Sequence, residues 1–102
     1  MIRFERSREF KRHMQAEALK FAKAAAALAK TIDSTARFQV FTGVFSSVEK
    51  VFWVGDFKGL AALEKTLMKI ESDSRWKKFV GQAPKDIFVE GSGRESIMKL
   101  VK

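Results

Sequence analysis

The sequence predicts a single α+β domain in which an antiparallel sheet carries two helices on one face. Two observations lead to this fold class. The spacing of apolar residues changes along the chain from the strand period to the helix period and back, in the order βαββαβ. The chain is also short, with 102 residues of which 46% are hydrophobic, and this suits one packed core but not two. We therefore expect one domain over residues 1–102.

The first strand and the first helix follow from the spacing of their apolar residues. Ile2 and Phe4 alternate with charged residues, as in a short strand that ends at Glu5. A helix is predicted from about Ser7 to Thr31, with Ser7 as its N-cap. Its apolar stripe advances in steps of three and four residues and consists of Phe10, Met14, Ala18, Phe21, Ala25, Leu28 and Ile32.

The rest of the chain predicts a hairpin, a helix pair and a last strand. Residues 37–45 and 48–57 are rich in β-forming residues, and Ser46-Ser47 is the expected turn between them. A second helix starts at about Gly59, and Asp73 is expected to cap a further short helix. Residues 87–89 predict the fourth strand, whereas residues 97–101 fit either a strand or a helical turn. This order of elements is that of the ferredoxin-like fold.

Both faces of the predicted hairpin carry large apolar side chains. One parity holds Phe38, Val40, Val48, Phe52 and Val54, and the other holds Phe41, Phe45, Val51, Trp53 and Phe57. A sheet with one wet face would alternate apolar and polar residues. Since two helices cover one face only, we expect a second copy of the chain to cover the other and form a homodimer. The alternative is that the second helix or the C-terminal tail covers it.

Two segments resemble the NIPSNAP-like group of the dimeric α/β-barrel superfamily. Residues 52–63 (FWVGDFKGLAAL) are similar to that group's strand, aromatic turn and Leu/Ala-rich helix, and residues 72–79 (SDSRWKKF) to its Asp-x-x-Trp segment. The resemblance implies a dimeric α/β barrel, in which two ferredoxin-like subunits press their sheets together. The superfamily also contains antibiotic-biosynthesis and haem-degrading monooxygenases. The haem-degrading type relies on an Asn, a Trp and a His, whereas this chain has no asparagine and no histidine near Thr66 and Leu67.

No catalytic or metal-binding set of residues is complete in the sequence. There is no cysteine, and the single histidine, His13, has no second histidine to share a metal. Asp56 and Asp73 stand where helices begin, so helix capping explains them. We expect no metal or prosthetic group. If the chain is an enzyme, the resemblance implies a cofactor-independent, monooxygenase-like reaction.

A small-molecule pocket between helices and sheet is the function that the sequence favours. Such clefts are apolar and of ligand size, and the candidate ligand-binding residues are Met14, Phe21, Arg37, Trp53 and Trp76. The expected ligand is small, apolar or aromatic, with an anionic group beside the arginine. The alternative is an RNA-binding module of the same topology, since Lys50 and two aromatic residues of the third strand match the RNA-recognition pattern.

Charge and location complete the sequence-based expectations. The net charge of +8 is spread along the chain and interrupted by acidic residues, so we expect only weak binding to nucleic acid. The N-terminal residues have no apolar signal core, and no apolar stretch approaches the length of a membrane span. A cysteine-free chain of this kind is expected in the cytoplasm and not at a membrane.

Overall fold

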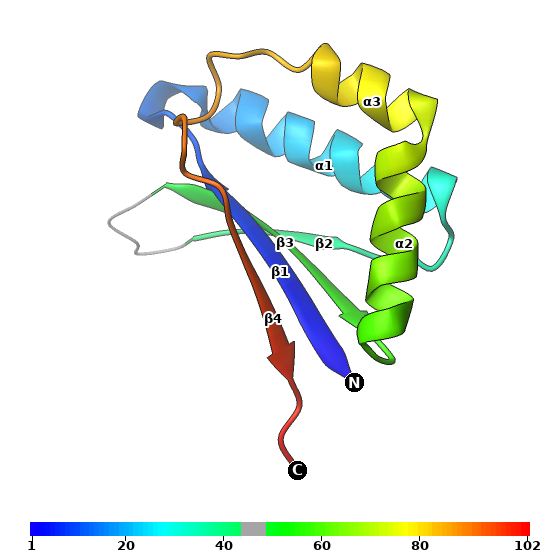
Figure 1. Ribbon diagram of the computed structural model, residues 1–102. Coiled ribbons are helices and arrows are strands. Elements are labelled where there is room, and N and C mark those ends of the chain that lie inside the picture. The colour runs from blue at the N-terminus through cyan, green and yellow to red at the C-terminus, as the bar shows by residue number, and fades with distance from the viewer. Residues whose placement is uncertain (44–48) are drawn as a thin grey trace.

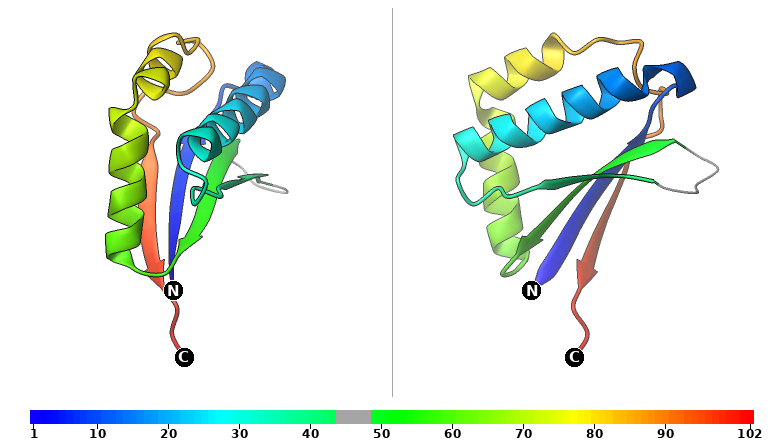
Figure 2. Two further views of the ribbon diagram at one scale, coloured as in Figure 1. Left: turned by 90° about the vertical axis from the view of Figure 1, so that its right-hand side faces the viewer. Right: turned by 180° about the vertical axis from the view of Figure 1, so that it is seen from behind.

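The computed structural model describes residues 1–43 and 49–102. Its elements are β1 (Ile2–Glu9), the 3-10 helix η1 (Arg12–Met14), α1 (Gln15–Ile32), β2 (Gln39–Thr42), β3 (Lys50–Phe57), α2 (Leu60–Ser72), α3 (Ser74–Gly81) and β4 (Arg94–Lys99). The strands form one antiparallel sheet in the order β2-β3-β1-β4. The helices lie together on one face of this sheet (Figures 1 and 2). This arrangement confirms the predicted ferredoxin-like fold class.

Strand β1 is longer than the sequence predicts, and the first helix begins later. All eight residues of β1 pair with β3, from Ile2 opposite Phe57 to Glu9 opposite Lys50. Ser7 therefore lies buried within the strand, and the prediction that it caps a helix is wrong. Strand pairing outweighs the local preference of Ser7 for a helix N-cap, because β1 is a central strand. Its backbone forms hydrogen bonds with β3 on one side and with β4 on the other.

Helix α1 packs on the sheet through small side chains. Its buried residues are Ala18, Ala22, Ala25, Ala29 and Ile32. Alanine has no side-chain atoms beyond Cβ, so the helix backbone approaches the sheet closely. The indole Nε1 of Trp53 donates a hydrogen bond of 3.0 Å to the carbonyl oxygen of Ala22. The larger members of the predicted stripe, Phe21 and Leu28, are only half-buried, because they flank the alanine surface.

The β2–β3 hairpin has apolar residues on both faces, as predicted. Along β3, burial alternates: Val51, Trp53, Gly55 and Phe57 are buried under the helices. The residues between them point to the open face of the sheet, where Phe52 lies opposite Phe41 of β2. Phe41 is 51% exposed. The predicted turn at Ser46-Ser47 and the predicted face positions of Phe45 and Val48 lie outside the described residues.

The junction between α2 and α3 agrees with the prediction. Helix α2 begins directly after Gly59 and buries Leu63, Thr66 and Ile70. The carboxylate of Asp73 accepts a hydrogen bond of 2.8 Å from the backbone N–H of Arg75. Asp73 is therefore the N-cap of α3, and the predicted cap is confirmed.

The fourth strand lies later in the chain than the sequence predicts. Residues 87–89 do not form it. Ile87 and Phe88 are buried, and Phe88 makes only an isolated bridge to Phe10. The chain then turns at Gly91, whose φ of 76° favours glycine, and residues 94–99 pair with β1 as β4. Every residue of β4 is exposed, so this edge strand has no buried face that an alternating pattern could reveal.

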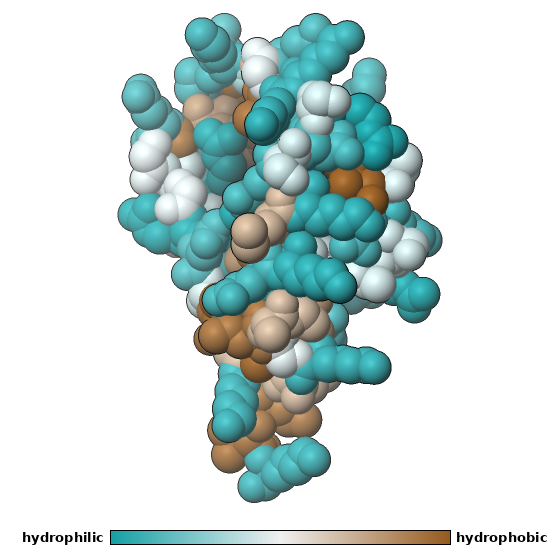
Figure 3. Space-filling view, turned by 45° about the vertical axis from the view of Figure 1, so that its right-hand side comes forward, coloured by the Kyte–Doolittle hydropathy of each residue, from teal (hydrophilic) through white to brown (hydrophobic). Residues whose placement is uncertain are grey.

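The two sides of the molecule differ in their surfaces. Hydrophilic residues cover most of the side on which α2 lies, and hydrophobic residues gather toward the end where the termini lie (Figures 1 and 3). The exposed apolar residues at this end are Met1, Ile97, Met98, Leu100 and Val101. None of the helices in the described part of the chain has the length and apolar character that crossing a membrane requires.

Candidate functional site

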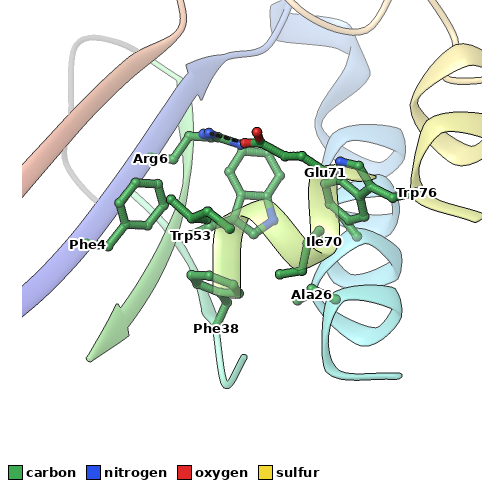
Figure 4. A pocket seen from close by; sticks show the side chains of 11 residues that line it. Phe4, Arg6, Ala26, Phe38, Trp53, Ile70, Glu71 and Trp76 are labelled. Atoms are coloured by element: carbon green, nitrogen blue, oxygen red, sulfur yellow. Dashed lines mark ion pairs between the residues drawn. The ribbon is translucent and has the colours of Figure 1, made fainter. Parts of the chain in front are cut away.

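An apolar cavity lies where the three helices meet the inner face of β1 and β3 (Figure 4). Four aromatic side chains contribute to its wall: Phe4, Phe38, Trp53 and Trp76. The remaining lining residues are Arg6, Ala25, Ala26, Ala29, Leu67, Ile70 and Glu71. The cavity has a volume of about 50 Å³, room for water-sized molecules only.

Trp53 is a fixed part of the cavity wall. Its place on β3 has the parity that points toward the helices, and the side chain is only 9% exposed. The hydrogen bond from its Nε1 to Ala22 holds the indole against α1. Since this bond uses the one polar group of the ring, Trp53 offers apolar surface and no free donor to a ligand.

Trp76 forms the more exposed wall of the cavity. It lies on α3 and is half-buried. Its ring centroid lies 6.0 Å from that of Phe79, which in turn stacks on Phe21 at 5.1 Å. Within the described residues, no acceptor bonds its indole N–H. In that part of the chain, Trp76 is therefore held by packing, against Phe79 and the cluster that includes Ala29 and Ile70.

Arg6 brings a positive charge to the rim of the cavity. Its Nε lies 2.8 Å from Oε1 of Glu95, and its Nη2 contacts the same oxygen. Nη2 also lies 4.0 Å from Oε1 of Glu71, the ion pair drawn in Figure 4. Both carboxylates are more than half exposed. Exposed ion pairs of this kind contribute little stability, so an anionic ligand could replace one of them.

The structure brings two of the five predicted ligand-binding residues together. Trp53 and Trp76 line the same cavity. Met14 and Phe21 pack against the core cluster that contains Trp53, but neither lines the cavity. Phe21 instead meets the edge of Phe88, with ring centroids 5.5 Å apart. Arg37 is exposed and lines a separate depression beside α1.

The sequence analysis did not predict three residues that line the cavity from the side of the sheet. They are Phe4 and Arg6 of β1 and Phe38, which precedes β2. The signal for Arg6 is the strand period, because Ile2, Phe4 and Arg6 share one face of β1. Ending the predicted strand at Glu5 hid this. Phe38 precedes β2, and its ring packs edge-on to Phe4 with centroids 6.0 Å apart.

The remaining candidate groups have structural roles. Hydrogen bonding from Arg3 lowers the pKa of Asp56, and hydrogen bonding from Arg75 lowers the pKa of Asp73. Both carboxyl groups are therefore ionised at neutral pH and poorly suited as proton donors. Arg94 donates to the carbonyl oxygens of Gly91 and Gly93 at 3.0 and 2.8 Å. A strand, not a helix, follows this turn, so it has no helix N-terminus for a phosphate.

A metal site is not apparent in the parts of the chain that the structure describes. No three His, Asp or Glu side chains of residues 1–43 and 49–102 gather as metal ligands would. His13 is exposed on η1.

The fold is that of NIPSNAP-family proteins. No protein-family model and no curated protein matches the chain, whereas several solved structures do. A NIPSNAP family protein of unknown function from Agrobacterium tumefaciens has a TM-score of 0.79 at 17% identity, covering 100% of this chain and 89% of that one. An uncharacterised NIPSNAP domain protein from Burkholderia xenovorans gives 0.80 at 14%, covering 99% and 95%. An antibiotic biosynthesis monooxygenase gives 0.69 at 11%, covering both chains fully. The predicted resemblance is thus confirmed for the fold.

Proposed function

We propose that this protein binds a small, largely apolar ligand with an anionic group, one in each subunit of a homodimer. The observation that carries the proposal is the aromatic cavity with the Arg6 guanidinium at its rim. Small-molecule sites typically combine an apolar lining with a few placed polar groups that orient the ligand. Here the aromatic walls would hold the body of the ligand, and Arg6 would pair with its anionic group.

Binding requires the cavity to widen. Its volume of about 50 Å³ is well below the roughly 300–1,000 Å³ of typical ligand sites. Trp76 is the wall best placed to move, because it is half-buried and sits on a helix of eight residues. Trp53 would stay in place, since its hydrogen bond to α1 fixes it. The ligand would thus change the surroundings of Trp76 more than those of Trp53.

Tryptophan fluorescence tests this proposal directly, because both tryptophans of the chain line the cavity. The titration compares 2-naphthoate with the neutral 2-naphthalenemethanol and then extends to polyketide-like acids. We expect a saturable response to the acid, most of which is lost in Trp76→Phe. The charge reversal Arg6→Glu should weaken the binding of the acid by about tenfold or more. The binding of the neutral alcohol should stay unchanged.

Arg12→Glu is the matched control for this titration. Arg12 is 92% exposed and does not line the cavity, so the variant changes the net charge equally without touching the site. The ligand-binding function is refuted if no compound gives a saturable response. It is also refuted if Arg6→Glu and Arg12→Glu weaken the binding of the acid equally.

The open face of the sheet supports the homodimer. Phe41 is exposed there beside the half-buried Phe52, and Met98 lies on the same face opposite Arg3. Hydrophilic residues dominate the helix side instead (Figure 3). A second copy of the sheet would remove this apolar surface from water, and a stable interface of this kind would bury more than roughly 1,000 Å².

The same open face is where RNA bases would stack if the chain were an RNA-binding module. In the dimer, Phe41 and Phe52 are covered and unavailable. We therefore expect single-stranded RNA to bind weakly at roughly 150 mM salt, because only screened charge contacts remain. Saturable micromolar binding that Phe52→Ala weakens would favour the RNA function over the dimer.

A further inference from the structure

A second site is suggested by Arg8, which is half-buried yet has no acceptor for its side chain in the part of the chain that the structure describes. No carboxylate or carbonyl oxygen of residues 1–43 and 49–102 lies within bonding distance of its guanidinium. Other arginines are paired: Arg3 with Asp56, Arg6 with Glu95, Arg12 with Glu49, Arg75 with Asp73, and Arg94 with backbone oxygens. Arg37 makes no such bond to the described residues either, but it is exposed.

The surroundings of Arg8 hold its guanidinium in place and leave its donors free. The guanidinium carbon lies 4.3 Å from the centroid of the Phe88 ring, and Phe88 itself is buried. A guanidinium that lies over a ring keeps its N–H edges available for a planar oxyanion. Burial also lowers the pKa of Arg8, because the charged form has lost water without gaining a carboxylate.

Arg8 opens into a groove separate from the aromatic cavity. The groove has a volume of about 500 Å³, and its lining residues are Arg8, Val80, Gly81, Ala83, Pro84, Lys85, Phe88 and Glu90. Lys85 adds a second positive charge to Arg8, and Glu90 is the one negative charge of this lining. Val80, Ala83 and Pro84 offer apolar surface beside the charges. The groove is therefore built for an anion that carries an apolar body.

We propose that this groove binds a small organic oxyanion, a carboxylate or a phosphate monoester, with Arg8 as a two-point partner. The anion would take the place of the water that Arg8 has lost, and charge-assisted hydrogen bonds of this kind are among the stronger ones. Arg8 has the same parity on β1 as Arg6 and faces the helices, so a partner covering the open sheet face leaves the groove accessible.

Nuclear magnetic resonance of the full chain tests the groove at residue level. Benzoate, phenyl phosphate and the neutral benzyl alcohol are titrated while the backbone amides of Ala83, Lys85 and Glu90 and the side-chain Nε–H of Arg8 are followed. We expect saturable shifts at these groups with at least one anion and none with the alcohol. The benzoate and phenyl phosphate arms show which oxyanion the groove prefers.

Four variants distinguish a specific site in the groove from general charge attraction. Arg8→Gln should weaken the preferred anion about tenfold or more, and Arg8→Lys should weaken it too, because an ammonium cannot make the two-point contact. Glu90→Gln should tighten binding, because it removes the negative charge of the groove. Arg12→Gln, which removes an equal charge outside the groove, should change little.

The outcomes distinguish this site from the cavity. An absence of shifts at the groove residues in the folded wild-type protein overturns the proposal, whatever the tryptophan titration shows. Equal weakening by Arg8→Gln and Arg12→Gln also overturns it, because the attraction would then be unspecific. The cavity proposal fails or stands on the tryptophan response alone.

Discussion

At the scale of single residues, Gly55 shows how closely the sheet and its aromatic residues pack beside the cavity. Gly55 is buried on β3, opposite Phe4 of β1. A Cβ atom at this position would lie 2.8 Å from Cδ1 and 2.9 Å from Cε1 of Phe38, and 3.2 Å from Cε2 of Phe57. The absence of a side chain at Gly55 thus makes room for the Phe38 ring, one wall of the cavity.

The substitution Gly55→Ala should therefore force Phe38 to shift and lower the free energy of unfolding by about 1–3 kcal/mol. Urea denaturation measures this as a lower midpoint. Gly81→Ala is the matched control, since a Cβ there meets nothing within 4 Å. Because Gly81 belongs to helix α3, alanine should leave the stability unchanged or raise it slightly. Equal stability of Gly55→Ala and wild type would show that Phe38 moves at no cost.

At the scale of elements, local signals predicted some boundaries and pairing decided others. The start of α3 was predictable, because an aspartate cap is a local interaction within a few residues. The end of β1 was not, because eight pairs with β3 outweigh the capping signal at Ser7. Arg6 was missed as a cavity residue for the same reason. Trp53 and Trp76 were predicted from their residue type. Arg6 faces the cavity only because pairing with β3 and β4 extends β1 beyond Glu5, and the sequence of β1 alone does not show this.

The cap at Asp73 gives a pH-dependent stability. Hydrogen bonding from Arg75 lowers the pKa of this carboxyl group in the folded state, below the roughly 3.9 of an unfolded aspartate. Its stabilisation is therefore complete above that value and is lost as the pH falls through the lower folded pKa. Asp73→Ala should lower the urea midpoint at pH 7, and the difference from wild type should shrink below about pH 4.

Asp86→Ala is the control for this experiment, because Asp86 is exposed in the loop after α3. This variant should leave the midpoint almost unchanged at both pH values. A difference between Asp73→Ala and wild type that stays constant from neutral to acidic pH would contradict the role of the ionised cap.

At the scale of the whole molecule, the distribution of apolar surface connects the fold to its assembly. The helices cover the inner face of the sheet, where Phe4, Val51, Trp53 and Phe57 are buried. The outer face keeps Phe41 51% and Met98 43% exposed. Apolar residues on both faces of the sheet were predictable from the alternation of residues in the hairpin. That alternation does not depend on where β1 or β4 ends. The face that meets the helices could not be predicted, because both parities are equally apolar.

If the outer face joins two copies, a charge at its centre should separate them. Phe41 is half-exposed in the subunit, so Phe41→Lys removes little from the subunit's own core and should leave it folded. In the dimer, two lysines would lose water within an apolar interface, which is costly for unpaired charges. Light scattering on the eluting peak should give a dimer of about twice 11.6 kDa for wild type and a monomer for Phe41→Lys.

Met68→Lys places the same charge on an apolar residue of α2 that is 71% exposed, and it should remain dimeric. A wild-type chain that stays monomeric and soluble at micromolar concentration would rule out the dimer, and dissociation by both lysines would place its interface elsewhere.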